Sequence, residues 1–156
     1  EYVGGREFNV GFVGTQALPV SEIDFTGLPD GNWPIVTYAA KWVPGSVYDQ
    51  HTIPICPARV TPALESQLIE VARIAWTAMA KCEGYGRVDI RLDEAGRPWV
   101  LEVNPDPDLS SDAGLARMGR AFGWDYQTLV MHVVEEALVR GRAALAEGAL
   151  SGRVTT

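Results

Sequence analysis

The chain has 156 residues, 47% of them hydrophobic, which is enough to fill one hydrophobic core and fits a single compact domain. Its 13 Lys and Arg residues against 20 Asp and Glu residues give a net charge of −7, which excludes a broadly basic surface for nucleic acid or an anionic membrane. The two cysteines, Cys56 and Cys82, cannot build a disulfide framework and lack zinc-ligand spacing. No apolar run is long enough for a membrane helix, and the first residues predict no export signal, so we expect a cytoplasmic protein.

The first part of the chain is typical of β-structure. Residues 7–14 alternate between apolar and polar side chains, and residues 17–25 form a second β-rich run, so the two predict a hairpin. After a Gly- and Pro-rich loop at 26–34, residues 35–42 predict another strand. Several prolines between 44 and 62 indicate that residues 43–61 form a long irregular loop, which is usually functional or mobile in a small domain.

The second part of the chain mixes helices and strands. Thr61 as the N-cap, Pro62 at the first helical position and apolar residues at spacings of three and four from Leu64 to Met79 predict a helix over 62–81. Strands at 85–93 and 98–104 follow, and then helices at 111–122 and 125–145. The order predicts an α+β fold, an antiparallel sheet with packed helices, over residues 1–146, and a flexible tail at 147–156.

The two strands at 85–93 and 98–104 are the most informative segment. If the two-residue turn Ala95-Gly96 joins them, directly opposed residues have numbers that sum to 191. Asp89 then faces Glu102, and Arg87 faces Asn104, because opposed residues share a face of the hairpin. This register gives a polar face with Arg87, Asp89, Arg91, Glu102 and Asn104, and an apolar face with Val88, Ile90, Leu92, Trp99, Leu101 and Val103.

Asp89 and Glu102 are two carboxylates in directly opposed positions. At a Cβ separation of about 5 Å they repel by about 3 kcal/mol at an effective dielectric constant of about 20. A solvated polar face is one interpretation of this alternation, and a divalent cation that reverses the sign of the interaction is the other. Carboxylates and the Asn104 amide oxygen are ligands of the type Mg²⁺ takes, and Arg87 beside them would hold a phosphoryl or oxyanion oxygen. The second interpretation predicts a phosphoryl-transfer or acyl-phosphate site.

Five short segments are distinctive when they are taken together: Glu7 in GREFNV, Lys41 in YAAKW, Cys56-Pro57-Ala58, GYGRVDIRL at 84–92 and LEVNP at 101–105. In this order they resemble the C-terminal part of the D-alanine–D-alanine ligase branch of the ATP-grasp superfamily. The resemblance spans almost the whole chain, and it implies that residues 1–146 are the C-terminal, nucleotide-binding and metal-binding lobe of that fold.

The resemblance also implies ATP as cofactor and a role for each matching residue. The backbone from Glu1 to Val3 would meet the adenine, Glu7 the ribose, and Lys41 would lie near the nucleotide. Arg87 would be the catalytic residue that stabilises the transferred phosphoryl group and the tetrahedral intermediate. The ligands of Mg²⁺, or of Mn²⁺ in its place, would be Asp89, Glu102 and Asn104.

The activity implied is that of an ATP-dependent carboxylate–amine ligase that works through an acyl phosphate. Its substrates are a small-molecule carboxylate and an amine, and its catalysis needs the N-terminal and central lobes of the family, so this chain alone is expected to be inactive. A homo-oligomer is compatible with the sequence. Two alternatives stay open: a non-catalytic ATP-grasp-like module that binds a nucleotide or a protein partner, and an enzyme that uses a hydroxyl or thiol nucleophile.

The segment after LEVNP departs from the ligase pattern. Asp108 stands where the family has a glycine whose backbone approaches the intermediate, and Ala113-Gly114 stand where it has a Ser-Leu pair that receives the carboxylate of the second amino acid. The sequence therefore predicts an acceptor other than D-alanine, with a free amine and no α-carboxylate or with a positive charge.

Overall fold

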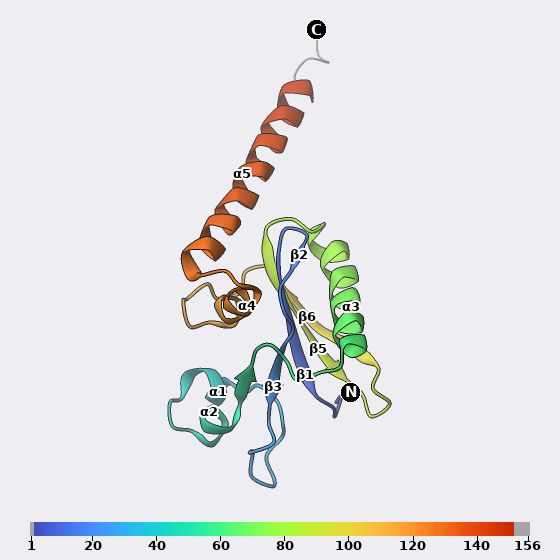
Figure 1. Ribbon diagram of the computed structural model, residues 1–156, viewed down its shortest axis with the longest axis vertical. Coiled ribbons are helices and arrows are strands. Elements are labelled where there is room, and N and C mark those ends of the chain that lie inside the picture. The colour runs from blue at the N-terminus through green and yellow to red at the C-terminus, as the bar shows by residue number, and fades with distance from the viewer. Residues whose placement is uncertain (1, 152–156) are drawn as a thin grey trace.

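A computed structural model describes residues 2–151, without the side chains of residues 144 and 146–151. A six-stranded antiparallel sheet has the order β4-β3-β1-β5-β6, and the short strand β2 pairs with β1 (Figure 1). The predicted α+β class is confirmed. The elements are, in chain order, β1 (Glu7–Val13), β2 (Gln16–Ala17), β3 (Ser21–Asp24), α1 (Tyr38–Trp42), α2 (Val47–His51), β4 (Ile53–Ile55), α3 (Pro62–Ala80), β5 (Tyr85–Leu92), β6 (Pro98–Asn104), α4 (Gly114–Phe122) and α5 (Tyr126–Ser151).

Helix α3 covers one face of the sheet along its length (Figure 1). Its buried residues Leu68, Ala72 and Trp76 lie one turn apart and pack on the side chains of β1 and β5 that point to this face. The sheet contributes Phe8, Val10, Phe12, Val88, Ile90 and Leu92 to this main core. Met79, at the end of the predicted apolar series, is instead largely exposed.

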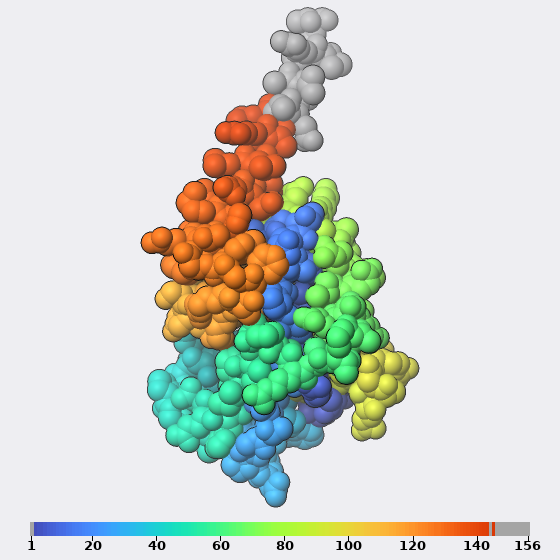
Figure 2. All heavy atoms as spheres, viewed as in Figure 1, coloured from blue at the N-terminus to red at the C-terminus, as the bar shows by residue number. Residues whose placement is uncertain are grey.

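Helices α4 and α5 cover only one end of the opposite face (Figure 1). The contact depends on Gly11 in the middle of β1, because a Cβ atom there would lie 2.7 Å from the Leu115 side chain and 3.0 Å from the Met118 sulfur. The ribbon of α5 extends away from the sheet (Figure 1), and the coloured atoms of this helix project beyond the other elements in the space-filling view (Figure 2). The remaining part of this face, where β1 and β5 carry polar side chains, is left without a covering helix.

The predicted pairing of β5 with β6 is correct at one end and wrong at the other. Arg87 pairs with Asn104 and Asp89 with Glu102, as the sum of 191 requires. A bulge follows, and Ile90 pairs with Val100 rather than with Leu101. The extra residue turns Leu101 and Trp99 away from the core, so both are half-exposed and their predicted place on the apolar face is wrong.

The bulge is accompanied by a longer turn than predicted. Leu92 and Pro98 form the last pair, so residues 93–97 make the turn in place of Ala95-Gly96 alone. The Asp93 carboxylate accepts hydrogen bonds from the backbone N–H groups of Ala95 and Arg97 and from the indole of Trp99. These hydrogen bonds lower the pKa of Asp93 to about 2, and the bond from the Trp99 indole has the largest effect.

The strand predicted at 35–42 is wrong, because residues 38–42 form the short helix α1. The side chain of Thr37 caps it by accepting a hydrogen bond from the N–H of Ala40, and alanine and lysine favour helix over strand. The loop predicted at 43–61 likewise contains α2 and the edge strand β4. In the first hairpin, Pro19 divides the predicted run 17–25 into β2 and β3, since proline cannot donate to a neighbouring strand.

The helix predicted at 62–81 is confirmed as α3, whereas the last two helices have different bounds. Helix α4 begins at Gly114 rather than at 111, and its N-cap Ala113 makes no side-chain hydrogen bond. Helix α5 continues past 145 to Ser151, so residues 147–151 of the predicted tail are helical, and residues 152–156 lie outside the described residues. Within the described part of the chain, no helix has the length and apolar character needed to cross a bilayer.

Replacing Gly86 with alanine is expected to lower the free energy of unfolding by about 1–3 kcal/mol, the usual cost of overpacking a core. A Cβ atom at Gly86 would overlap the ring of Trp76, which is fully buried, stacks on Phe12 and donates to the carbonyl of Gly14. Urea unfolding of the purified chain measures the change. The control is Gly141→Ala in α5, where nothing lies within 4 Å and alanine favours the helix. Equal stability of the wild type and Gly86→Ala would contradict this packing.

Candidate functional site

The uncovered part of the sheet forms one wall of a cavity of about 450 Å³. The N-terminal segment before β1, the residues around α1 and the start of α4 supply the other walls. Six of the eight residues that the sequence singled out line this one cavity, although they come from positions spread over a hundred residues: Val3, Glu7, Lys41, Arg87, Asp89 and Glu102.

Asn104 does not line this cavity. Asn104 ends β6, and its side-chain oxygen accepts a hydrogen bond of 2.9 Å from the N–H of Asp106, so in this conformation it is used in a local turn. Glu1 lies outside the described residues.

The centre of the cavity wall is a hydrogen-bonded cluster around Asp89. Arg87 donates to both carboxylate oxygens of Asp89, at 2.6 and 2.8 Å, and Asn9 on β1 donates to one of them at 2.8 Å. The hydrogen bond with Asp89 raises the pKa of Arg87, with its burial acting in the opposite direction. The Asp89 carboxylate is therefore fixed in position by two neighbours, one on its own strand and one on the adjacent strand.

The donor set fits a hard divalent cation that is also bound by phosphate and water. Asp89 and Glu102 are cross-strand partners and line the same cavity, so their oxygens face a common space. No third carboxylate, histidine or cysteine joins them in the part of the chain that the structure describes. Two protein carboxylates with the rest of the shell from substrate and water is the mode in which Mg²⁺ is usually held.

A second buried ion pair lies at the other end of the same wall. Arg91 is 2% exposed, and its Nε atom donates to the Glu7 carboxylate at 3.0 Å. Burial raises the pKa of Glu7, and the positive charge of Arg91 partly offsets this effect. The pair thus keeps a buried carboxylate next to the cavity without an unpaired charge.

The segment that follows Asn104 is attached to the sheet through Tyr85. The Tyr85 hydroxyl donates a hydrogen bond of 2.5 Å to Asp106, which is part of the departure from the ligase pattern. The Asp108 carboxylate accepts from the N–H and the hydroxyl of Ser110 and does not line the cavity. The start of α4 does line it, through Gly114 and Arg117.

Sequence reasoning missed three polar residues of the cavity. Asn9 lies on the face of β1 opposite Phe8 and Val10, so the alternation of that strand was a usable signal. Arg91 was correctly placed on the polar face of the hairpin but was given no role. Arg117 had no signal in the sequence, because only the packing of α4 brings it to the sheet; its Nε is buried without a hydrogen-bond partner among the described residues.

The sheet, the cavity and the ordered motifs define the C-terminal lobe of an ATP-grasp ligase. More narrowly, the chain belongs to the family described as D-ala D-ala ligase C-terminus, which matches residues 1–135.

Relatives and solved structures agree with this family. The chain is 33% identical over 141 residues to D-alanine–D-alanine ligase from Bordetella petrii, covering 88% of this chain and 40% of that protein. It shares the fold of D-alanine–D-alanine ligase from Bacillus anthracis complexed with ATP, with a TM-score of 0.67 and 23% identity over 90% of this chain and 40% of the other. For the ligase from Coxiella burnetii the TM-score is 0.70, with 18% identity over 98% and 38% of the two chains. The chain thus spans about two fifths of the ligases it matches.

Asp106→Asn is expected to lower the pKa of Tyr85 from about 12 towards the ordinary tyrosine value of about 10. The hydrogen bond to an ionised carboxylate favours the protonated phenol, so its stabilising effect is present below pH 10 and is lost as the pH rises through about 12. Absorbance near 295 nm over an alkaline titration follows the phenolates. Comparison with Tyr85→Phe identifies the part of the titration curve that belongs to Tyr85. Asp108→Asn, which leaves the Tyr85 contact intact, serves as the control, and an unchanged pKa in Asp106→Asn would contradict the contact.

Proposed function

We propose that this chain is the C-terminal nucleotide-binding and metal-binding lobe of an ATP-dependent carboxylate–amine ligase. The observation that carries the proposal is the convergence on one cavity of six residues that the sequence singled out, in a chain of the D-ala D-ala ligase C-terminus family. The Bacillus anthracis ligase, which has the same fold, was solved in complex with ATP, and this supports ATP as the nucleotide. Since the chain spans about two fifths of its relatives, the complete activity requires the remaining lobes of the fold.

The proposed roles are those that the family resemblance implies, and the position of each side chain is compatible with its role. Val3 and Glu7, at one end of the cavity, meet the adenine and ribose, and Lys41 in the last turn of α1 carries a positive charge toward the phosphates. Asp89, Glu102 and Asn104 would hold Mg²⁺, which would neutralise phosphate charge. For this, Asn104 would leave the N–H of Asp106, and Arg87 would release an oxygen of Asp89.

Arg87 acts on charge that develops during the reaction. It is fixed on β5 by Asp89, so its guanidinium reaches the site of reaction at little cost in side-chain entropy. In the proposed reaction a substrate carboxylate oxygen attacks the γ-phosphorus of ATP and ADP leaves. An amine then attacks the carbonyl carbon of the acyl phosphate, phosphate leaves and the nitrogen loses a proton. Arg87 stabilises the transferred phosphoryl group and the oxyanion of the second step.

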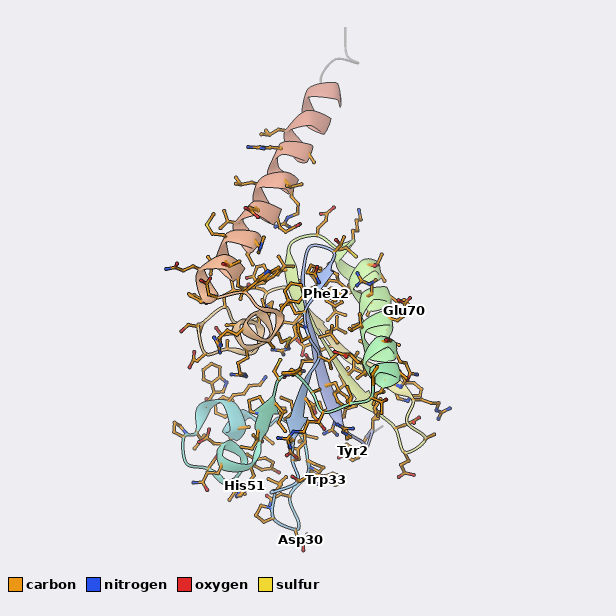
Figure 3. The ribbon with its side chains drawn as sticks, in the orientation of Figure 1. Tyr2, Phe12, Asp30, Trp33, His51 and Glu70 are labelled. Atoms are coloured by element: carbon orange, nitrogen blue, oxygen red, sulfur yellow. The ribbon has the colours of Figure 1, made fainter. Side chains whose placement is uncertain are left out.

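Asp89→Asn and Glu102→Gln are expected to abolish most ATP turnover in the full-length protein, because each removes a charged metal ligand. Arg87→Ala is expected to lower kcat by about 100-fold or more with a smaller change in KM, since it acts mainly in the transition state. Steady-state release of ADP measures both. Glu70→Gln, a carboxylate-to-amide change on the exposed side of α3 (Figure 3), is the matched control. An unchanged kcat in Arg87→Ala would contradict its role, and nucleotide binding without turnover in the wild type would favour a non-catalytic module.

D-alanine as the sole substrate is expected to give phosphate release at a hundredth or less of the rate found with a preferred amine. Ala113, the N-cap of α4, offers no hydroxyl to an acceptor carboxylate, and an unpaired carboxylate in the site costs a few kcal/mol. A panel of amines and amino acids, with D-alanine among them, provides the measurement. Efficient formation of D-alanyl-D-alanine would overturn the prediction and would instead assign the acceptor carboxylate to Arg117 at the start of α4.

A further inference from the structure

Arg91 connects three segments that are far apart in the sequence. Besides its bond to Glu7 on β1, its Nη1 atom donates to the carbonyl of Val3 at 2.9 Å, and its Nη2 atom donates to the carbonyl of Pro34. Each nitrogen of the guanidinium therefore has its own acceptor, two of them in the N-terminal stretch 3–7 and one in the loop that leads to α1. A planar fork of this kind fixes its partners in position as well as in charge.

Aromatic contacts reinforce the same connection. The guanidinium of Arg91 lies 5.3 Å from the ring centre of Tyr2 and 5.6 Å from that of Phe25. Tyr2 in turn meets Trp33 edge to face at 5.1 Å, and the two side chains lie side by side at the lower end of the sheet in Figure 3. The N-terminal segment and the loop that leads to α1 are thus held against each other and against β5.

These segments carry the residues to which the proposed function assigns the nucleoside. Val3 and Glu7 are direct partners of Arg91, and Ile35 and Val36, which line the cavity, follow Pro34 directly in the chain. Without Arg91, Glu7 would be a buried carboxylate without an ion-pair partner, and the two segments would lose their common anchor on the sheet.

We propose that Arg91 is a positioning residue that holds the Glu7 carboxylate and the Val3 backbone in the arrangement that receives a nucleoside. This rests on the proposed function. It goes beyond that function because it assigns the preference for a ribose over a deoxyribose to a residue whose three guanidinium nitrogens each donate to an acceptor within the protein. Arg91 acts on the nucleoside through Glu7.

The experiment compares ATP with 2′-deoxy-ATP and 3′-deoxy-ATP in the full-length protein. The measured ratio is kcat/KM for ATP divided by kcat/KM for whichever of the two deoxynucleotides the wild type uses less well. Arg91→Met is expected to raise the KM for ATP at least tenfold, with a smaller change in kcat, and to bring the ratio to the value found in Glu7→Gln. The double variant is expected to show no further loss of the ratio, because both changes remove the same contact. A general loss of stability would lower both rates and leave the ratio unchanged.

Two further variants keep the test decisive. Arg91→Lys retains the charge but cannot reach three acceptors, so it is expected to lose part of the ratio, and it carries the test if Arg91→Met does not fold. Arg6→Met removes another arginine–glutamate pair of the same sheet, the 2.7 Å pair with Glu22, which does not line the cavity. It is expected to leave the ratio at the wild-type value.

Different results would overturn the role of Arg91 and the proposed function. The role of Arg91 alone would be overturned if the wild type uses ATP and discriminates against a deoxynucleotide, and folded Arg91 variants keep the wild-type ratio. A wild-type protein that neither binds nor uses ATP would overturn the proposed function and the inference with it.

Discussion

Two ion pairs on adjacent central strands are the constraint on which this lobe depends. Arg91 with Glu7 and Arg87 with Asp89 lie largely out of water, on the side of the sheet that α3 does not cover. Removing such groups from water costs several kcal/mol for each ion, and it is offset only when every donor and acceptor is satisfied. Here Asn9 donates a further hydrogen bond to Asp89, and the carbonyls of Val3 and Pro34 accept hydrogen bonds from Arg91. A pair of apolar residues would pack at less cost, so chemistry explains these positions better than stability does.

The two faces of the sheet therefore have different tasks. In β1 and β5 the face toward α3 is apolar and supplies the main core, in which Trp76 is fully buried. On the other face, α4 packs closely on β1 at Gly11, where the side chain is absent. Because α4 begins only at Gly114, the rest of this face stays open toward the cavity. The start of α4 is therefore one of the limits of the site.

Local patterns were sufficient for the parts of the structure that depend on neighbours in sequence. The Thr61-Pro62 cap predicted α3. The register that follows from a turn at Ala95-Gly96 placed Asp89 opposite Glu102 correctly, although the turn itself is longer than predicted. The bulge beyond Asp89 could not be predicted, because it follows from the five-residue turn that Asp93 organises through its side chain. The β-branched and aromatic residues from Ile35 to Tyr38 favour a strand, and only Thr37, as the N-cap of α1, indicates that a helix begins there. Arg91 bonds partners 57 to 88 residues away, and no local pattern carries that information.

The bulge has a consequence for the ligand as well as for the register. It leaves the pairing of Asp89 with Glu102 intact and turns the next side chain of β6, Leu101, to the cavity. Ile23, Ile35 and Val36 reach the same cavity from two other segments. Charged groups on β5 and β6 and apolar groups around them therefore line a single space. A ligand with a flat apolar end and an anionic end satisfies both kinds of lining, as a nucleoside triphosphate does, whereas free phosphate or a bare metal ion leaves the apolar part unused.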